Sequence, residues 1–267
     1  MGVSVSILAS GSRGNCAVIA SSTTRILVDA GISCRETFKR IKATGGDPRA
    51  LSAILITHEH DDHVYGLAML ARKLGVPVFM TGATHQVWAK AIRDATGERP
   101  EVGQLELFSS GRHFQVGDIS VTPFTIPHDA ADPVGFTFRA EGVKIGLATD
   151  LGYIPASVRN HLQGCDLLVI ESNHDVEMLR GGPYPWMVKQ RVMSRVGHLS
   201  NDALAEFFCG DYDGSATYVV LAHLSEHNNL PELARKAAEK ALGARRTLLQ
   251  NRVLLAEQGE PMEAIRL

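Results

Sequence analysis

The chain has 267 residues, of which 45% are hydrophobic, and its formal net charge is −2. This length suits one large globular domain or two small ones, and the low net charge excludes a global basic field, so that contact with nucleic acid requires a local patch. No apolar run approaches the roughly 20 residues of a membrane span, and we recognise no signal peptide. The four cysteines are scattered without a CxxC pair, which favours reduced thiols in a cytoplasmic protein: Cys16, Cys34, Cys165 and Cys209.

The first part of the chain alternates short apolar runs with turn residues. Strands are predicted at residues 3–9, 16–20 and 25–29, and a helix at 34–43. Between the first two strands lies the loop Ser10-Gly11-Ser12-Arg13-Gly14-Asn15. Its residue types suit either backbone N–H groups presented to an anion or a tight turn between strands. It is not a phosphate-binding P-loop, because the Gly-Lys-Ser/Thr ending is missing.

Three histidines and three acids follow an apolar strand at residues 53–57, in the order His58-Glu59-His60-Asp61-Asp62-His63. The next residues, 64–74, have the apolar spacing of a helix. Side chains two apart in an extended segment point the same way, so His58 and His60 can bind one ion together. Asp62 and His63, at the start of the helix, face another side and can bind a second ion. A solvated polar loop is the alternative, but packing several imidazoles together without a cation gains little stability.

Further histidines and acids occur at the ends of later strands. Strands are predicted at 76–80 and across residues 105–148, with a helix at 83–95 between them. His128 and Asp150 each follow one of these strands. An acid at the end of a buried strand needs cations or hydrogen-bond donors, although Asp150 could instead cap a helix at 153–162.

The last part of the chain repeats this arrangement. A strand at 166–170 ends in Glu171-Ser172-Asn173-His174-Asp175, and a strand at 217–221 is followed by His223. Helices are predicted at 202–209 and 231–242, and strands near 252–256 and 263–267. The segment 184–195 supplies a modest basic surface that could follow a phosphate backbone or be a solvated helix face. No linker divides the chain, so we expect one domain, residues 1–267, whose loops converge on one edge of a β-sandwich.

The strand-end residues together form a set of five imidazoles and two carboxylates, which is sufficient for two divalent ions. The predicted metal ligands are His58, His60, Asp62, His63, His128, Asp150 and His223. Mixed nitrogen and oxygen ligands suit Zn²⁺ or Mn²⁺, and the absence of thiolates argues against a structural zinc site. Two ions about 3.5–4 Å apart would convert a bridging water to hydroxide near neutral pH, and the hydroxide could attack phosphorus. The leaving alcohol needs a proton, which His198 or His174 could supply.

These motifs resemble the metallo-β-lactamase superfamily, and their order and spacing resemble its YycJ/WalJ exonuclease branch over nearly the whole chain. The resemblance implies a fold of two mixed sheets flanked by helices, an αββα sandwich. It also implies a metal-dependent 5′-to-3′ DNA exonuclease, with DNA repair as the process.

The resemblance further implies that one ion lies among His58, His60 and His128, that Asp62, His63 and His223 hold the other, and that Asp150 bridges them. In related ribonucleases the histidine equivalent to His198 faces the phosphate. We accordingly expect catalytic roles for Asp62, His198 and His174. Substrate contacts are expected from Ser12, Asn15, Asn173, Arg191 and Ser200.

Four other functions can be weighed against this pattern. The first alternative is a PhnP-like phosphodiesterase that acts on small cyclic phosphodiesters. A β-lactamase or glyoxalase II is less consistent, because the cysteine ligand of many lactamases and a recognisable glutathione site are absent. A nucleic-acid-binding protein without catalysis would not be expected to keep the full ligand set.

Overall fold

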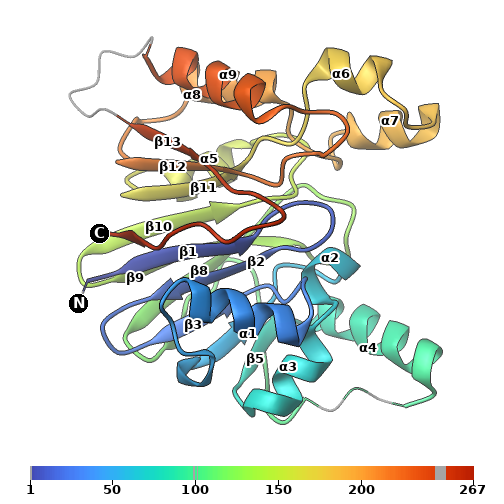
Figure 1. Ribbon diagram of the computed structural model, residues 1–267, viewed down its shortest axis with the longest axis vertical. Coiled ribbons are helices and arrows are strands. Elements are labelled where there is room, and N and C mark those ends of the chain that lie inside the picture. The colour runs from blue at the N-terminus through green and yellow to red at the C-terminus, as the bar shows by residue number, and fades with distance from the viewer. Residues whose placement is uncertain (1, 99, 101, 244–250) are drawn as a thin grey trace.

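Two sheets pack face to face between layers of helices in the computed structural model, which describes residues 2–98, 100, 102–243 and 251–267 (Figure 1). Within these residues each sheet has seven strands. In spatial order, the first sheet contains β14 (Ile265–Arg266), β1 (Ser4–Ala9), β2 (Cys16–Ala20), β3 (Arg25–Val28), β4 (Ala53–Leu55), β5 (Val78–Thr81) and β6 (Leu105–Phe108). The second contains β13 (Arg252–Leu255), β12 (Tyr218–Ala222), β11 (Leu167–Glu171), β10 (Val143–Ala148), β9 (Val134–Ala140), β8 (Ile119–Thr125) and β7 (Phe114–Val116).

Helices cover the outer face of each sheet. The first sheet is covered by α1 (Cys34–Ala43), α3 (Leu67–Leu74) and α4 (Gly82–Thr96), with η1 (Pro48–Ala50) and α2 (Asp61–Val64) at their ends. On the side of the second sheet lie α5 (Ala156–Leu162), α6 (Val176–Gly181), α7 (Trp186–Val192), α8 (Asn201–Gly210) and α9 (Pro231–Gly243). The predicted αββα sandwich of two mixed sheets is therefore confirmed.

The strand β4 illustrates why its sequence is apolar without alternation. Leu55 packs in the core between the two sheets, whereas the neighbouring Ile54 packs in the core between the first sheet and its helices. Both side chains are fully buried. A strand that is buried on both faces requires a continuous apolar run.

Parallel strands bring several of the loops with predicted metal ligands to one edge of each sheet. In the first sheet β3, β4, β5 and β6 pair in parallel, and in the second β10, β11, β12 and β13 do so. The carboxyl ends of parallel strands lie at one edge of a sheet, where ligands bind in open α/β sheets. The loops after β4, β10 and β12 carry the predicted metal ligands except His128, which follows the antiparallel strand β8.

The helix predicted at 64–74 differs from the structure. It begins earlier, as α2, and is interrupted at Tyr65 and Gly66 before α3. The Gly66 N–H donates to the Ala30 carbonyl at 2.7 Å, and a Cβ at Gly66 would lie 2.2 Å from the Ile32 carbonyl oxygen. This close approach of a distant loop requires glycine and breaks the helix, which no local pattern indicates.

The structure corrects one further helix prediction and adds the burial state of each of the four cysteines. The helix predicted at 153–162 begins only at Ala156, after Pro155, so Asp150 does not cap it. Three cysteines are buried, whereas Cys209 is exposed.

None of the helices in the described ranges is long and apolar enough to cross a membrane.

Candidate metal centre

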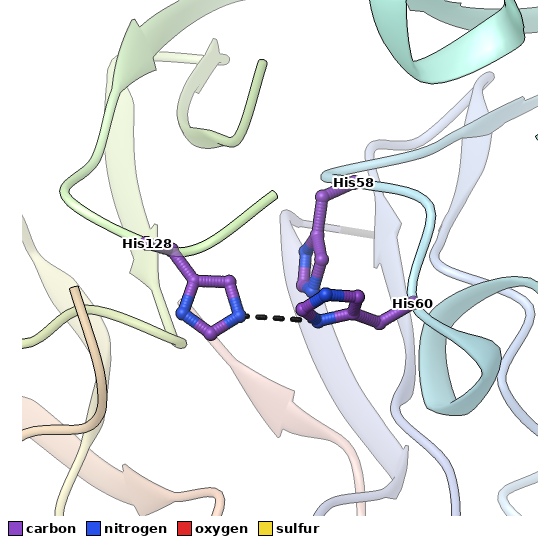
Figure 2. Close-up of side chains that lie close together, drawn as sticks. All are labelled: His58, His60 and His128. Carbon is purple, nitrogen blue, oxygen red and sulfur yellow. Dashed lines mark hydrogen bonds between the residues drawn. The ribbon is translucent and has the colours of Figure 1, made fainter. Parts of the chain in front are cut away.

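The first group of ligands consists of three imidazoles that converge from two loops (Figure 2). His58 and His60 lie between β4 and α2, and His128 lies just after β8. One nitrogen from each ring lies within 4.8 Å of the others. The Nε2 atom of His128 is 3.2 Å from Nδ1 of His60. The structure thus brings together the three residues predicted for one ion.

The second group combines carboxylates and imidazoles. Its ligand atoms also lie within 4.8 Å of one another, and it contains Asp62, His63, Asp150 and His223. The Nε2 atom of His63 is 3.3 Å from Asp150 Oδ2 and 3.5 Å from Asp62 Oδ2. Within the same limit of 4.8 Å, Asp150 does not join the group of His58, His60 and His128. The role of Asp150 as a bridge between two ions therefore stays a prediction.

Left-handed backbone conformations occur where strands deliver residues to this edge. Asp29, Asp150 and His223 have φ angles of 59°, 62° and 55°. Asp29 follows β3, Asp150 follows β10 and His223 follows β12. Such conformations are uncommon outside glycine and cost about 1–2 kcal/mol each. They persist here in the immediate surroundings of the ligand groups.

Orphaned buried atoms show that this donor set fits cations. The Nε2 atoms of His58 and His223 and the Oδ2 atom of Asp150 are buried and have no hydrogen-bond partner among the described residues. A buried polar atom left unpaired costs about 1–3 kcal/mol. One divalent ion at each group would satisfy these atoms, the first binding His58 and the second binding Asp150 and His223. The two groups offer only nitrogen and oxygen ligands, which suit Zn²⁺ or Mn²⁺.

Glu171, at the end of β11, connects the second group to His198. Its Oε1 atom lies 2.7 Å from Nδ1 of His223 and 2.8 Å from Nδ1 of His198. Its Oε2 atom accepts hydrogen bonds from the backbone N–H groups of Leu151 and Leu199, both at 3.0 Å. A carboxylate that binds Nδ1 of both rings orients their Nε2 atoms toward the site.

Asp29 has the same role toward His63. Its Oδ2 atom lies 2.8 Å from Nδ1 of His63, and its Oδ1 atom accepts from the Thr57 N–H at 2.8 Å. The Thr57 hydroxyl is in turn 3.0 Å from Nδ1 of His58. Neither Asp29 nor Glu171 is among the site residues predicted from the sequence. The signal that identified Asp150, an acid at the end of a buried strand, also applies to these two.

The pKa values of His58 and His128 are shifted in the opposite direction from those of His63 and His223. Burial lowers the pKa of His58 well below its ordinary value and also lowers that of His128. Burial acts in the same direction on His63 and His223, but Asp150 and further acids outweigh it and hold the pKa of both well above the ordinary value. Burial raises the pKa of Asp150, but the two imidazoliums outweigh it and hold that pKa well below its usual range.

The same balance applies to Glu171 and His198. Burial raises the pKa of Glu171, but the neighbouring His198 and His223 outweigh it and lower the value to about 2. Burial lowers the pKa of His198, and the Glu171 carboxylate reverses this so that the pKa lies above its ordinary value. Glu171 is therefore ionised and held among positive charges.

A pocket of about 600 Å³ opens over both groups. It is lined by ligands from each group, by His198, and by two of the predicted substrate residues, Ser12 and Arg191. The Arg191 guanidinium is held at the rim by Asp129, which lies directly after His128. The side chain of His198 is 22% exposed, so a substrate in the pocket can reach it.

Other predicted substrate residues lie outside this pocket. Asn15 is buried, and its Nδ2 atom donates to Asp62 Oδ2 at 3.1 Å, so it supports a ligand. Asn173 donates to the His223 carbonyl, and Ser200 caps α8. His174 is 2% exposed and contacts Asn173, and burial lowers its pKa to about 4. The pocket lining contains none of these four residues.

The glycine-rich loop at residues 10–15 forms a tight turn. The N–H groups of Gly11 and Arg13 donate to Asn15 Oδ1 and Gln258 Oε1. Those of Gly14 and Asn15 donate to backbone carbonyls. Because these four N–H groups already donate to acceptors in the loop, in Gln258 and in Asp62, the anion-binding interpretation is not supported for them.

Comparisons with known proteins agree with this geometry. A family model described as the beta-lactamase superfamily domain matches residues 24–224. Exodeoxyribonuclease YycJ of Bacillus anthracis is 40% identical over 91% of this chain and 90% of that protein. Exodeoxyribonuclease WalJ of Streptococcus pneumoniae is 37% identical over 88% of this chain and 86% of that protein. The metallo-beta-lactamase fold protein YhfI from Bacillus subtilis has a TM-score of 0.70 at 16% identity, covering 97% of this chain and 98% of that one, which concerns the fold alone.

Proposed function

This chain belongs to the beta-lactamase superfamily, as its motifs predicted, and from this premise we propose that it is a metal-dependent phosphodiester hydrolase that degrades DNA as a 5′-to-3′ exonuclease. One observation carries the proposal. Ligands from both groups, among them His60, His128 and Asp62, line a single open pocket. Two divalent ions, when bound, would lower the pKa of a water molecule to near neutrality and would polarise a phosphoryl oxygen.

The residues around the pocket have separate tasks in this reaction. Arg191, held by Asp129, faces the pocket as a cation that can bind a phosphate oxygen. Ser12 lies on the rim as a further hydrogen-bond donor. Asp62 lines the pocket and can orient the attacking water as well as bind an ion. These contacts would fix the phosphodiester in the geometry required for attack.

His198 is our candidate for the proton donor. Glu171 occupies its Nδ1 atom, so its Nε2 atom is the one available to a substrate in the pocket. A proton given from Nε2 to the leaving oxygen would complete cleavage of the P–O bond. His174 does not line the pocket, and we therefore prefer His198.

The choice of DNA as substrate is supported by the two exodeoxyribonucleases that resemble this chain over most of its length. The direction of degradation is implied by the resemblance to that branch. Zinc and manganese both suit the ligands, and either would fill the proposed role.

A substrate panel tests this function. The purified protein, loaded with Mn²⁺ or Zn²⁺, is incubated with end-labelled linear DNA, with RNA of the same sequence and with a small cyclic phosphodiester. We expect degradation of DNA, loss of this activity on metal chelation, and its absence in His60→Ala. Intact DNA together with rapid hydrolysis of the cyclic phosphodiester would instead identify a PhnP-like phosphodiesterase. DNA binding without turnover in either metal would identify a binding protein.

A further inference from the structure

A stripe of exposed side chains leads away from the pocket along α2 and α3. Asp61 lines the pocket, and Tyr65 and Met69 follow at intervals of four residues. The Tyr65 N–H donates to the Asp61 carbonyl at 2.9 Å, and the backbone of Tyr65 is still helical. Residues four apart in a helix lie on the same face. The side chain of Tyr65 therefore lies one helical turn from the rim of the pocket.

Tyr65 is unusually exposed for an aromatic residue, at 73%. Met69, in the first turn of α3 beyond the break at Gly66, is 48% exposed. Exposed apolar side chains that are grouped next to a functional pocket indicate a surface for a partner or substrate. A tyrosine ring in this position offers a flat face for stacking.

The surface around this stripe is basic. The helices α1 and α3 lie side by side, and Lys73 Nζ lies 4.9 Å from the centre of the Phe38 ring (Figure 1). Arg72 contacts the sulfur of Met69 at 3.3 Å. Residues 33–46 and 63–76 contain one acid, Glu36, and five exposed Lys or Arg residues: Arg35, Lys39, Lys42, Arg72 and Lys73. Arg40 in the same range is buried and bonds Glu36 and two backbone carbonyls. Asp61, at the pocket end of the stripe, is an exposed acid. In a chain with a net charge of −2, this is a local concentration of positive charge.

We infer that this stripe binds single-stranded DNA, with a base stacked on Tyr65 and phosphates near Arg72 and Lys73. The inference rests on the proposed function and adds the form of the substrate. A flat aromatic face beside cations is the arrangement by which proteins hold unpaired nucleotides. Duplex DNA offers Tyr65 no base face except at its end, because the others are stacked. A twofold contact between two copies would instead bring these cations together, which is unfavourable.

The test compares Tyr65→Ala and Tyr65→Phe with the wild type. The matched control is Leu107→Ala, which removes another exposed apolar side chain, 59% exposed, from β6 at the edge of the first sheet. Binding is measured by fluorescence anisotropy with a labelled single-stranded oligonucleotide whose phosphorothioate linkages resist cleavage. Hydrolysis of bis(p-nitrophenyl) phosphate is measured in parallel, because this small diester does not reach Tyr65.

We expect Tyr65→Ala to weaken binding by about 5- to 150-fold, which is the range for loss of one stacked base. Tyr65→Phe should bind like the wild type, Leu107→Ala should change the Kd by less than about twofold, and all variants should hydrolyse the small diester equally. An unchanged Kd in Tyr65→Ala would overturn the inference while the proposed function stands. A change of subunit number in Tyr65→Ala, seen by sedimentation, would overturn it in favour of a subunit interface. Wild-type protein that neither binds nor cleaves DNA would refute the proposed function itself.

Discussion

The Oε1 atom of Glu171 lies 2.8 Å from Nδ1 of His198. The same oxygen lies 2.7 Å from Nδ1 of His223, so one carboxylate orients both a metal ligand and the candidate proton donor. The carboxylate is fully buried and also accepts two backbone N–H groups. Glu171 thus bonds two imidazoles and two backbone N–H groups, although it does not line the pocket.

Replacing Glu171 with Gln should weaken metal binding by about 10- to 100-fold, the usual effect of losing a carboxylate behind a histidine ligand. The amide group cannot accept hydrogen bonds from both histidines and both N–H groups, because one of its ends is a donor. The Kd for Zn²⁺, measured by competition with a chelator, checks this expectation. Wild-type affinity in Glu171→Gln would show that His223 is oriented without this carboxylate.

Replacing His198 with Ala should lower kcat by about 10²–10⁴-fold, which is typical for a general acid. Both ions should stay bound, since His58, His63 and the other ligands are unchanged. Steady-state kinetics together with metal analysis of the purified variant test this. His113→Ala, an exposed substitution on another part of the surface, is the control and should have wild-type kinetics. An empty metal site in His198→Ala would reassign His198 as a ligand.

Gly31 should tolerate no side chain. A Cβ at this position would lie 1.7 Å from the Asp62 carbonyl oxygen and 2.5 Å from the Asn15 nitrogen. Gly31→Ala must therefore displace the segment that carries Asp62 and His63, and we expect loss of metal from the second group and a lower Tm. Gly82→Ala is the matched control, because its Cβ meets nothing within 4 Å. It should be neutral or slightly stabilising, by up to about 1 kcal/mol. Metal analysis and thermal unfolding of both variants decide this, and full metal content in Gly31→Ala would contradict it.

Metal binding should release protons from the second group. In the metal-free protein the pKa values of His63 and His223 are well above ordinary, so both rings are protonated at neutral pH. An ion binds only the unprotonated nitrogen. Affinity at this group should therefore fall as the pH drops below these raised pKa values. His58 and His128 have lowered pKa values and are neutral at pH 7, so they should contribute no such release.

Calorimetric titration of the metal-free protein with Zn²⁺ at pH 7 measures the release. The observed enthalpy should depend on the ionisation enthalpy of the buffer for the ion bound by His63 and His223. An enthalpy that is the same in all buffers for both ions would show that no proton leaves these rings.

The sequence allowed the ligands to be predicted because each follows a short apolar strand, and parallel strands deliver their ends to one edge. It did not indicate which neighbours of these ligands face the pocket. Asn15 and Asn173 turn inward and hold backbone or ligand atoms, because loop geometry, including the left-handed conformation of His223, decides their direction. The interruption at Gly66 likewise arises from contact with Ile32, more than thirty positions earlier in the chain.

Anomalous diffraction from crystals soaked in Mn²⁺ would locate the bound ions themselves. We expect two peaks, one enclosed by His58, His60 and His128 and the other by Asp62, His63, Asp150 and His223. No peak at either group, or ions bound only elsewhere on the molecule, would rule out the two-metal site.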